Sequence, residues 1–257
     1  MILEKLTTKH ENPVHYYLPD GTFLNERIGS EVFLEYQGRI ICKKCQQATK
    51  KSFGEGFCYP CFLSAPEASP CIIHPELCEA HLGKGRDVAY EEKYHNQPHL
   101  VYLAATDQVK VGVTRSTQMP TRWIDQGARE AIILAETPNR YLAGVIEVAL
   151  KERFSDKTNW QNMLRNVQED TFDLIAEKWD VLEALPEDIG QYFTEDETLY
   201  SFNYPVLNYP EKVASLTLDK EPSIRGILTG IRGQYLYFDN YLVLNIRRHT
   251  GYEINWR

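Results

Sequence analysis

The sequence predicts an α+β protein with an N-terminal β and zinc-ribbon module, a small central α/β domain, a helical segment and a C-terminal β-rich, barrel-like segment. Three observations support this fold class. Four of the six cysteines form two Cys-x-x-Cys pairs near the start of the chain. Short apolar runs near residue 100 precede an apolar pattern with helical period. Several β-like runs separated by turn residues then close the chain.

The composition is that of a soluble protein with an ordinary core. The chain has 257 residues, 43% of them hydrophobic, and a formal net charge of −8. No apolar run approaches the roughly 18–20 residues that span a membrane. The opening residues Met1–Thr8 include an acid and do not resemble a secretory signal. We therefore expect a cytoplasmic protein without a membrane partner, and the oligomeric state stays open.

The charge is unevenly distributed along the chain. Residues 169–197 carry eleven acids and one lysine, whereas residues 99–168 carry nine Lys or Arg and seven acids. The net charge argues against broad electrostatic affinity for nucleic acid. The central stretch tolerates phosphate, but strong binding there requires complementary shape or a metal ion.

Residues 14–41 read as β structure. A strand over Val14–Leu18 is followed by a turn at Pro19-Asp20-Gly21, where proline fixes φ and glycine accepts positive φ. Two further runs, Val32–Tyr36 and Arg39–Ile41, flank Gln37-Gly38 and predict a hairpin that leads into the first cysteine pair.

The two cysteine pairs predict a structural zinc site. Cys42 and Cys45 are separated by twelve residues from Cys58 and Cys61. Each pair places two sulfurs on one turn, and four thiolates close a tetrahedron around zinc. A redox role is less favoured, because redox Cys-x-x-Cys motifs occur singly.

A second cluster of cysteines and histidines follows. Cys71, Cys78 and His81 are the expected ligands of a second structural zinc ion. The fourth ligand is left open between His74, which gives a compact site, and His95, which ties the end of a loop to the same ion. The alternative is a pair of buried thiols with histidines on the surface.

The central stretch alternates strands and helices. Strands are expected at Leu100–Ala105, Val109–Thr114 and Ala131–Ala135. A short helix is expected between Pro120 and Gly127, and a longer one from Pro138 to about Phe154. The first carries Arg122, and the second carries Glu147 beside its apolar stripe.

The remainder of the chain is helical and then β-rich. Residues 160–185 read as helix with an acidic solvated face, and residues 186–212 read as a connector. The expected C-terminal strands are Ile224–Ile231, Tyr235–Phe238, Leu242–Ile246 and Tyr252–Trp256. Whether the N-terminal β segment pairs with them stays open. The expected segments are 1–41, 42–98, 99–160, 161–204 and 205–257.

Residues 99–160 resemble the GIY-YIG endonuclease superfamily. Leu100-Val-Tyr102 stands where the Gly-Ile-Tyr motif would be, and Lys110-Val-Gly-Val-Thr114 stands where Tyr-Ile-Gly-x-Thr would be. Arg122 follows at the distance of the family's helical arginine. Two departures are present, because position 100 is not glycine and Lys110 replaces the second tyrosine.

The resemblance implies a divalent-metal-dependent nuclease that cleaves DNA or RNA. Glu147 would bind Mg²⁺ or Mn²⁺, and Asn159 matches the family's later asparagine. Arg122 would bind two phosphate oxygens through its planar guanidinium. Tyr102 would orient or deprotonate a water, and Lys110 would assist it or bind phosphate. The alternatives are a nucleic-acid-binding module without cleavage, a scaffold for a protein partner, or polar groups with purely structural contacts.

The whole chain resembles the domain-of-unknown-function family 2797, an uncharacterised bacterial family. The motifs that carry this resemblance are Cys58-Tyr-Pro-Cys-Phe62, Pro98-His-Leu-Val-Tyr-Leu-Ala104, Arg122-Trp-Ile-Asp-Gln-Gly-Ala128 and Gly230-Ile-Arg-Gly-Gln-Tyr-Leu236. That family often has a cysteine at the position of His95, which favours His95 over His74 as a zinc ligand. The resemblance implies an architecture and no activity.

Overall fold

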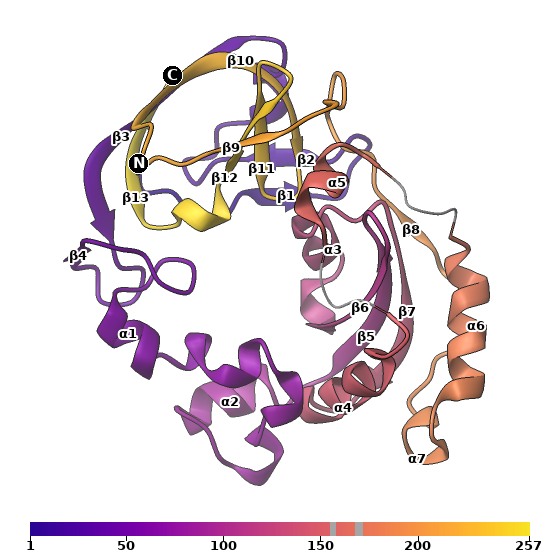
Figure 1. The fold of residues 1–257 in the computed structure, drawn as a ribbon. Coiled ribbons are helices and arrows are strands. Elements are labelled where there is room, and N and C mark those ends of the chain that lie inside the picture. Colours follow the sequence, from indigo (N-terminus) through magenta and orange to yellow (C-terminus); the bar gives the residue numbers. More distant parts are fainter. Residues whose placement is uncertain (155–157, 168–171) are drawn as a thin grey trace.

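The computed structural model describes residues 1–154, 158–167 and 172–257. The elements follow one another around a ring (Figure 1). A β unit built from both ends of the chain packs directly against the central domain at one part of the ring. The cysteine-rich module connects them, which matches the α+β class predicted from the sequence.

The β unit is a seven-stranded sheet that curls into a half-barrel (Figure 1). Its path runs through β13 (Tyr252–Trp256), β3 (Glu31–Ile41), β10 (Ser223–Arg232), β11 (Tyr235–Phe238), β12 (Leu242–Asn245) and β9 (Ala214–Leu216), with β4 (Ala48–Thr49) beside β3. All four predicted C-terminal strands are present. The question left open by the sequence is answered, because β3 lies between β10 and β13.

The predicted hairpin at Gln37-Gly38 is wrong. Residues 31–41 form the single strand β3, which continues through this dipeptide. Tyr36 pairs with Ile254 and Ile40 with Tyr252, so three residues of β3 face one residue of β13. Gly38 has a φ of +75° in this bulge, where glycine carries no steric penalty. The dipeptide therefore bends a strand instead of reversing it.

The start of the chain seals the β unit. The predicted strand at residues 14–18 is confirmed as β2 (His15–Tyr17), which pairs with β1 (Thr7–Lys9). The Leu3 amide donates to the carbonyl of Tyr252, and the terminal amine of Met1 donates to the carbonyl of Ile254. Leu3 and Leu6 are fully buried in the core of this unit.

The cysteine-rich module has little regular structure. It contains α1 (Tyr59–Ser64) and α2 (Val88–Tyr94). The side chain of Asp87 caps α2 by accepting a hydrogen bond from the amide of Tyr90. Four 3-10 turns connect them, at Pro66–Ala68, Pro70–Ile72, Pro75–Leu77 and Ala80–Leu82. Three of these turns begin with proline, which presets φ and prevents a longer helix.

The central domain is a four-stranded sheet with helices on one face. Its strand order is β6 (Val109–Arg115), β5 (His99–Ala105), β7 (Glu130–Thr137) and β8 (Tyr200–Ser201). Val101, Leu103 and Ala105 pack on one face with α4 (Arg140–Leu150) and α6 (Leu174–Ala184). Leu100, Tyr102 and Ala104 point to the opposite face and join the core of the β unit. The three predicted strands are confirmed.

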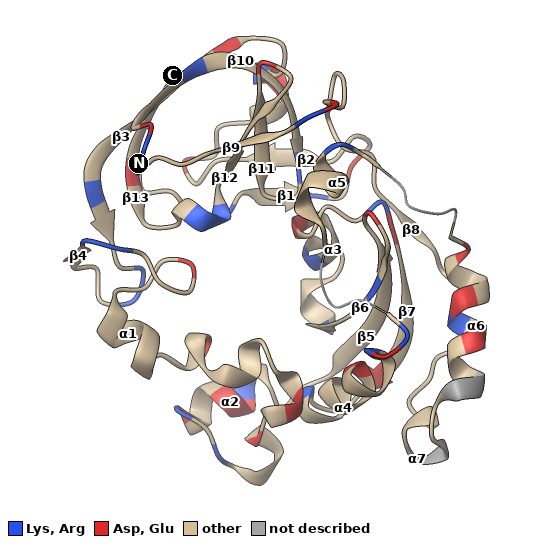
Figure 2. Ribbon diagram, in the orientation of Figure 1, with Lys and Arg blue, Asp and Glu red and all other residues tan. Residues whose placement is uncertain are grey.

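The remaining helices are α3 (Thr121–Asp125), α5 (Trp160–Leu164) and α7 (Glu187–Gly190). Of these, α3 and α5 lie in predicted helical segments, whereas α7 lies in the predicted connector, and the helical stretch predicted at 160–185 is interrupted after α5. Acidic residues dominate the charged positions of α6 (Figure 2), as expected for a solvated helix. Lys178 on α6 is the exception, because it is fully buried and donates to the carbonyls of Ile133 and Asp196. Among the described residues, no helix is long and apolar enough to cross a membrane.

Candidate functional site

The first cysteine cluster forms as predicted. The sulfur atoms of Cys42, Cys45, Cys58 and Cys61 all lie within 4.8 Å of one another. Cys42 comes from the end of the β3 region and Cys58 caps the start of α1, so the sheet and the helix hold the two pairs together. Four thiol ligands at this spacing fit a tetrahedral zinc ion with no open position. The cluster can therefore hold a structural metal ion.

The second cluster differs from the predicted ligand set in one member. Cys71, Cys78 and His95 come together, and the fourth group is the carboxylate of Glu91. His81 lies outside the cluster and stacks on the ring of Tyr141, with 4.6 Å between centroids. The alternative ligand His74 is also outside, since its Nδ1 lies 3.4 Å from a carboxylate oxygen of Glu76.

The donor set of the second cluster suits a metal ion. All four residues are buried, and the Glu91 carboxylate and the His95 Nδ1 are directed at each other from successive turns of α2. A hydrogen bond from the Cys78 thiol lowers the pKa of Cys71 to about 4. Two cysteine sulfurs, which bind zinc as thiolates, an imidazole and a carboxylate match the ligands that zinc accepts.

The sheet of the central domain carries a separate group of polar side chains around Tyr102. Tyr102 is 1% exposed. Its hydroxyl donates a hydrogen bond of 2.9 Å to the side-chain oxygen of Gln126. Gly112 lies directly opposite on β6. A Cβ atom at Gly112 would lie 2.6 Å from the Tyr102 hydroxyl, so only glycine leaves room for the ring. This explains the glycine of the Val-Gly-Val run.

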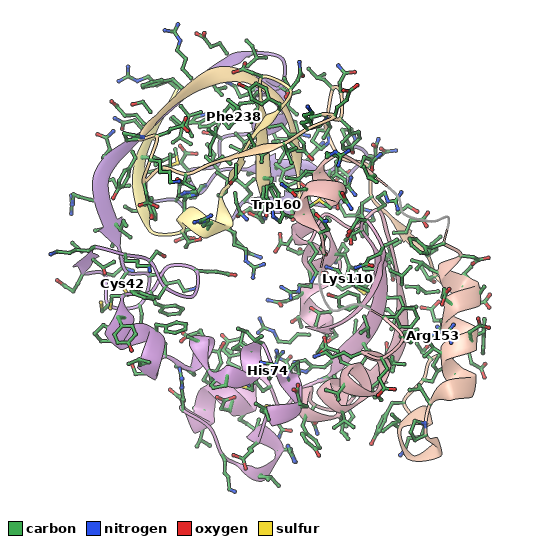
Figure 3. The ribbon with its side chains drawn as sticks, viewed as in Figure 1. Cys42, His74, Lys110, Arg153, Trp160 and Phe238 are labelled. Atoms are coloured by element: carbon green, nitrogen blue, oxygen red, sulfur yellow. The ribbon has the colours of Figure 1, made fainter. Side chains whose placement is uncertain are left out.

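Arg122 and Lys110 lie close to Tyr102. Burial raises the pKa of Tyr102, and the nearby Arg122 guanidinium opposes that rise. Lys110 lies on the central sheet (Figure 3), on the same face as Tyr102, and its Nζ donates to the Thr158 hydroxyl at 2.8 Å. Burial, followed by the Arg122 cation, lowers the pKa of Lys110 to about 7, against an opposing effect of Asp107. The amine is therefore partly neutral at physiological pH.

The buried Lys110 amine predicts a pH-dependent stability. The unfolded lysine holds its proton up to about pH 10.5 and the folded one only to about pH 7, so the free energy of unfolding rises with pH between these values. Lys110→Met should remove this rise, which amounts to about 1.4 kcal/mol per pH unit. Urea denaturation at pH 6 to 9 measures it, with the exposed Lys212→Met as control. A gain in stability from Lys110→Met that does not change with pH would contradict the assignment.

Glu147 lies on α4, whose apolar residues pack on the opposite face of the sheet from Tyr102. Its carboxylate is 9% exposed and lies 3.8 Å from the Nζ of Lys151, one helical turn away. The charge of Glu147 acts on the Tyr102 hydroxyl and on Arg140. The Arg122 cation acts on both Tyr102 and Lys110, so groups that are distant in sequence are linked through it. A carboxylate is the kind of ligand that Mg²⁺ or Mn²⁺ uses together with water and substrate phosphate.

Asn159 lies at the start of α5. Its side-chain oxygen accepts hydrogen bonds from the amides of Gln161 and Asn162, and so caps the N-terminus of α5. Its own amide donates to Asp107. These contacts explain the asparagine as a helix cap.

Three residues of these sites were missed in the sequence. Glu91 precedes His95 by four residues, and Gln126 follows Arg122 by four, a spacing that places side chains on the same face of a helix. Helical spacing could therefore have identified both. Thr158 gives no comparable signal, because it lies in a loop and meets Lys110 only through the fold.

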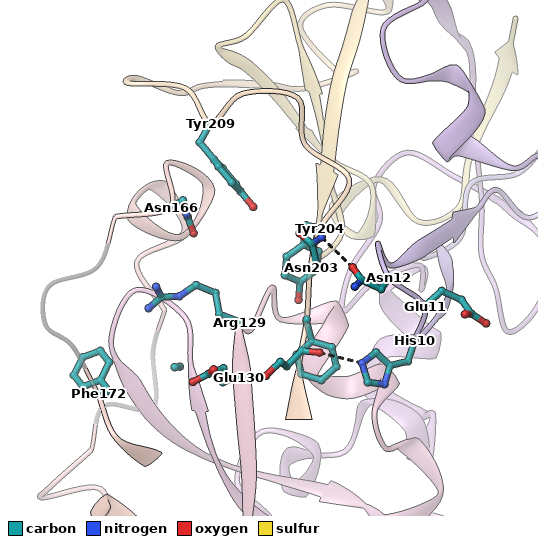
Figure 4. Close-up of a pocket in the computed structure, with 13 residues that line it drawn as sticks. His10, Glu11, Asn12, Arg129, Glu130, Asn166, Phe172, Asn203, Tyr204 and Tyr209 are labelled. Atoms are coloured by element: carbon teal, nitrogen blue, oxygen red, sulfur yellow. Dashed lines mark hydrogen bonds between the residues drawn. The ribbon is translucent and has the colours of Figure 1, made fainter. Parts of the chain in front are cut away.

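A polar cavity of about 770 Å³ lies apart from these groups, where the central domain meets the β unit (Figure 4). Arg129, Glu130, Asn166 and Tyr209 line it, together with residues 10–12 and 201–204. None of the described residues that line it is a predicted site residue. Burial lowers the pKa of Arg129, and the neighbouring Arg232 adds to this effect.

Comparison with known proteins identifies a family and no closer relative. The family model described as "Protein of unknown function (DUF2797)" matches residues 29–254, which cover most of the chain. No curated protein and no solved structure matches the chain. The match includes both cysteine clusters, the polar group around Tyr102 and most of the β unit. The chain therefore belongs to the DUF2797 family of proteins of unknown function.

Proposed function

We propose that the central domain is a divalent-metal-dependent nuclease that hydrolyses phosphodiester bonds of DNA or RNA. The observation that carries the proposal is the position of Tyr102 and Lys110 on one face of the sheet, where the Arg122 cation acts on both and the charge of Glu147 acts on Tyr102. Phosphodiester hydrolysis needs a base, a cation for the phosphate and a ligand for a metal ion. The group supplies each of these.

The residues have separate roles in the proposed reaction. Glu147 would hold Mg²⁺ or Mn²⁺, which would neutralise charge on the phosphate. Arg122 binds two phosphate oxygens through its planar guanidinium. The neutral amine of Lys110 accepts a proton from the attacking water as the new P–O bond forms and the leaving P–O bond breaks. A pKa of about 7 suits a base at neutral pH. Tyr102 positions Arg122 through its hydroxyl.

Nicking of plasmid DNA and cleavage of labelled RNA in the presence of Mn²⁺ or Mg²⁺ test the proposal. Glu147→Gln and Arg122→Ala should lower the cleavage rate by about 100-fold or more. The first removes the charge that would hold the metal ion, and the second removes the cation that binds the phosphate. Lys110→Met should lower it by a similar factor and abolish the rise of the rate around pH 7. The measurement is the single-turnover rate across pH 5.5 to 9.

Two matched substitutions on the same sheet serve as controls. Glu136 is an exposed acid on β7, and Arg115 lies at the far end of β6 over the ring of Tyr94. The Glu136→Gln and Arg115→Ala variants should cleave nucleic acid at the rate of the wild-type protein. Cleavage that survives Glu147→Gln and Arg122→Ala would show that the activity comes from elsewhere.

A second candidate function is nucleic-acid binding without cleavage. The burial of Tyr102 and its hydrogen bond to Gln126 favour this alternative, because the hydroxyl already has a partner. It predicts binding that weakens with salt and with Arg122→Ala, and no turnover with any divalent ion. An electrophoretic mobility shift at low ionic strength, run beside the cleavage assay, separates the two functions.

A further inference from the structure

The first residue of α4 is tied to the second metal cluster. Arg140 donates through Nε to the carbonyl of Cys71 and through Nη2 to the carbonyl of Ile72, each at 2.9 Å. Its backbone amide donates to the carbonyl of His95, also at 2.9 Å. The start of the helix is therefore bonded to both segments that supply ligands, one on each side of the cluster.

One turn further along, the helix packs directly on the backbone of the metal module. A Cβ atom at Gly144 would lie 2.2 Å from the amide nitrogen of Glu76 and 2.4 Å from the carbonyl carbon of Pro75. Those residues form the 3-10 turn between Cys71 and Cys78. A metal ion that joins the two cysteines fixes the path of this turn, and hence the surface on which α4 lies.

The same face of α4 carries the proposed metal ligand of the nuclease site. Arg140, Gly144 and Glu147 are separated by four and three residues, a spacing that places them in one row along a helix. Glu147 is the next member of the row after Gly144. Its charge acts on Arg140 at one end and on Tyr102 at the other. The row thus runs from the second metal cluster along α4 to Glu147.

We propose that metal binding at the second cluster positions Glu147, with Arg140 and Gly144 as the positioning residues. With the ion bound, the turn at residues 75–77 is fixed and α4 is held against the sheet. Without it, the turn is released and the helix loses the backbone on which Gly144 packs. The role of Glu147 rests on the proposed nuclease function, whereas the control of α4 by the metal cluster does not.

Hydrogen–deuterium exchange of the zinc-loaded full-length protein tests the proposal without reference to activity. Cys78→Ser should remove the second metal ion and speed amide exchange across residues 143–150 by about tenfold. Cys58→Ser removes a ligand of the first cluster and should leave exchange of α4 unchanged. Electron paramagnetic resonance titration with Mn²⁺ should show about tenfold weaker binding in Cys78→Ser, a typical loss when the support of a ligand is removed.

Gly144→Ala tests the contact with both clusters intact. The added methyl should push α4 from the turn, so exchange should rise and Mn²⁺ binding should weaken while two zinc ions stay bound. Gly190→Ala is the matched control, because a Cβ there meets no atom within 4 Å. Wild-type exchange of α4 in metal-depleted Cys78→Ser or in Gly144→Ala would overturn the proposal. Faster exchange in both, together with a wild-type protein that binds no Mn²⁺, would support it and reject the nuclease function.

Discussion

Cys58→Ser should unfold the module from Cys42 to Ser64, including β4, while the other six strands of the sheet stay folded. Apart from Cys42 and Phe57, this module buries almost no side chain, so apolar packing contributes little to its stability. Structural zinc sites contribute about 10 kcal/mol or more of binding free energy, which becomes folding free energy in such modules. Loss of one thiolate should therefore remove both the metal ion and the local fold.

Zinc content and limited proteolysis measure this effect. The variant should lose one metal ion per chain and gain protease cleavage sites between residues 43 and 64, with no new sites in β10–β13. Ser64→Ala is the control, because this exposed hydroxyl donates to the carbonyl of Pro60 within its own helix. Full metal content together with wild-type protection in Cys58→Ser would show that the cluster is not a metal site.

Arg232→Ala should lower the free energy of unfolding by about 3–5 kcal/mol, since it removes a fully buried charge and strands its partners. Arg232 is 0% exposed at the end of β10. Its Nε and Nη2 donate to the carbonyl of Gly127, and its Nη1 donates to Asn166. The rings of Tyr204 and Tyr209 enclose the guanidinium. The side chain therefore connects the β unit to the central domain.

Arg225→Ala provides the comparison on the same strand. Arg225 is 71% exposed and pairs with Glu31 at 2.8 Å, and exposed ion pairs contribute about 0–1 kcal/mol. Urea denaturation of both variants measures the difference. Equal losses for Arg232→Ala and Arg225→Ala would mean that the buried arginine does not connect the two units.

Local signals in the sequence were sufficient where a short segment decides the structure. Strands β5 and β6 follow from apolar runs around a polar turn, and the first cysteine cluster follows from its spacing alone. The N-cap of α4 also lies where the sequence places the helix start, at Asn139 after Pro138. In these cases the deciding contacts are between residues close in sequence.

The errors arose where distant contacts decide the outcome. Gln37-Gly38 resembles a turn, but pairing with β13 keeps β3 extended and turns the dipeptide into a bulge. His81 was expected to be a ligand, but its ring stacks on Tyr141 of α4 outside the cluster. The fourth group of the cluster is Glu91. The burial that lowers the pKa of Lys110 likewise depends on Thr158 and Arg122, which reach it from other elements.

The position of β3 has a consequence for how the protein is made. This strand pairs with β10 and β13, whose paired residues follow it by about 190 to 220 positions. During synthesis, the cysteine-rich module and the central domain leave the ribosome before either partner strand exists. We therefore expect them to acquire structure first, with both edges of β3 unpaired. Unpaired strand edges promote aggregation. Only release of the finished chain lets β10 and β13 pair with β3, so this step, rather than the chemistry of the sites, should limit the yield of native protein.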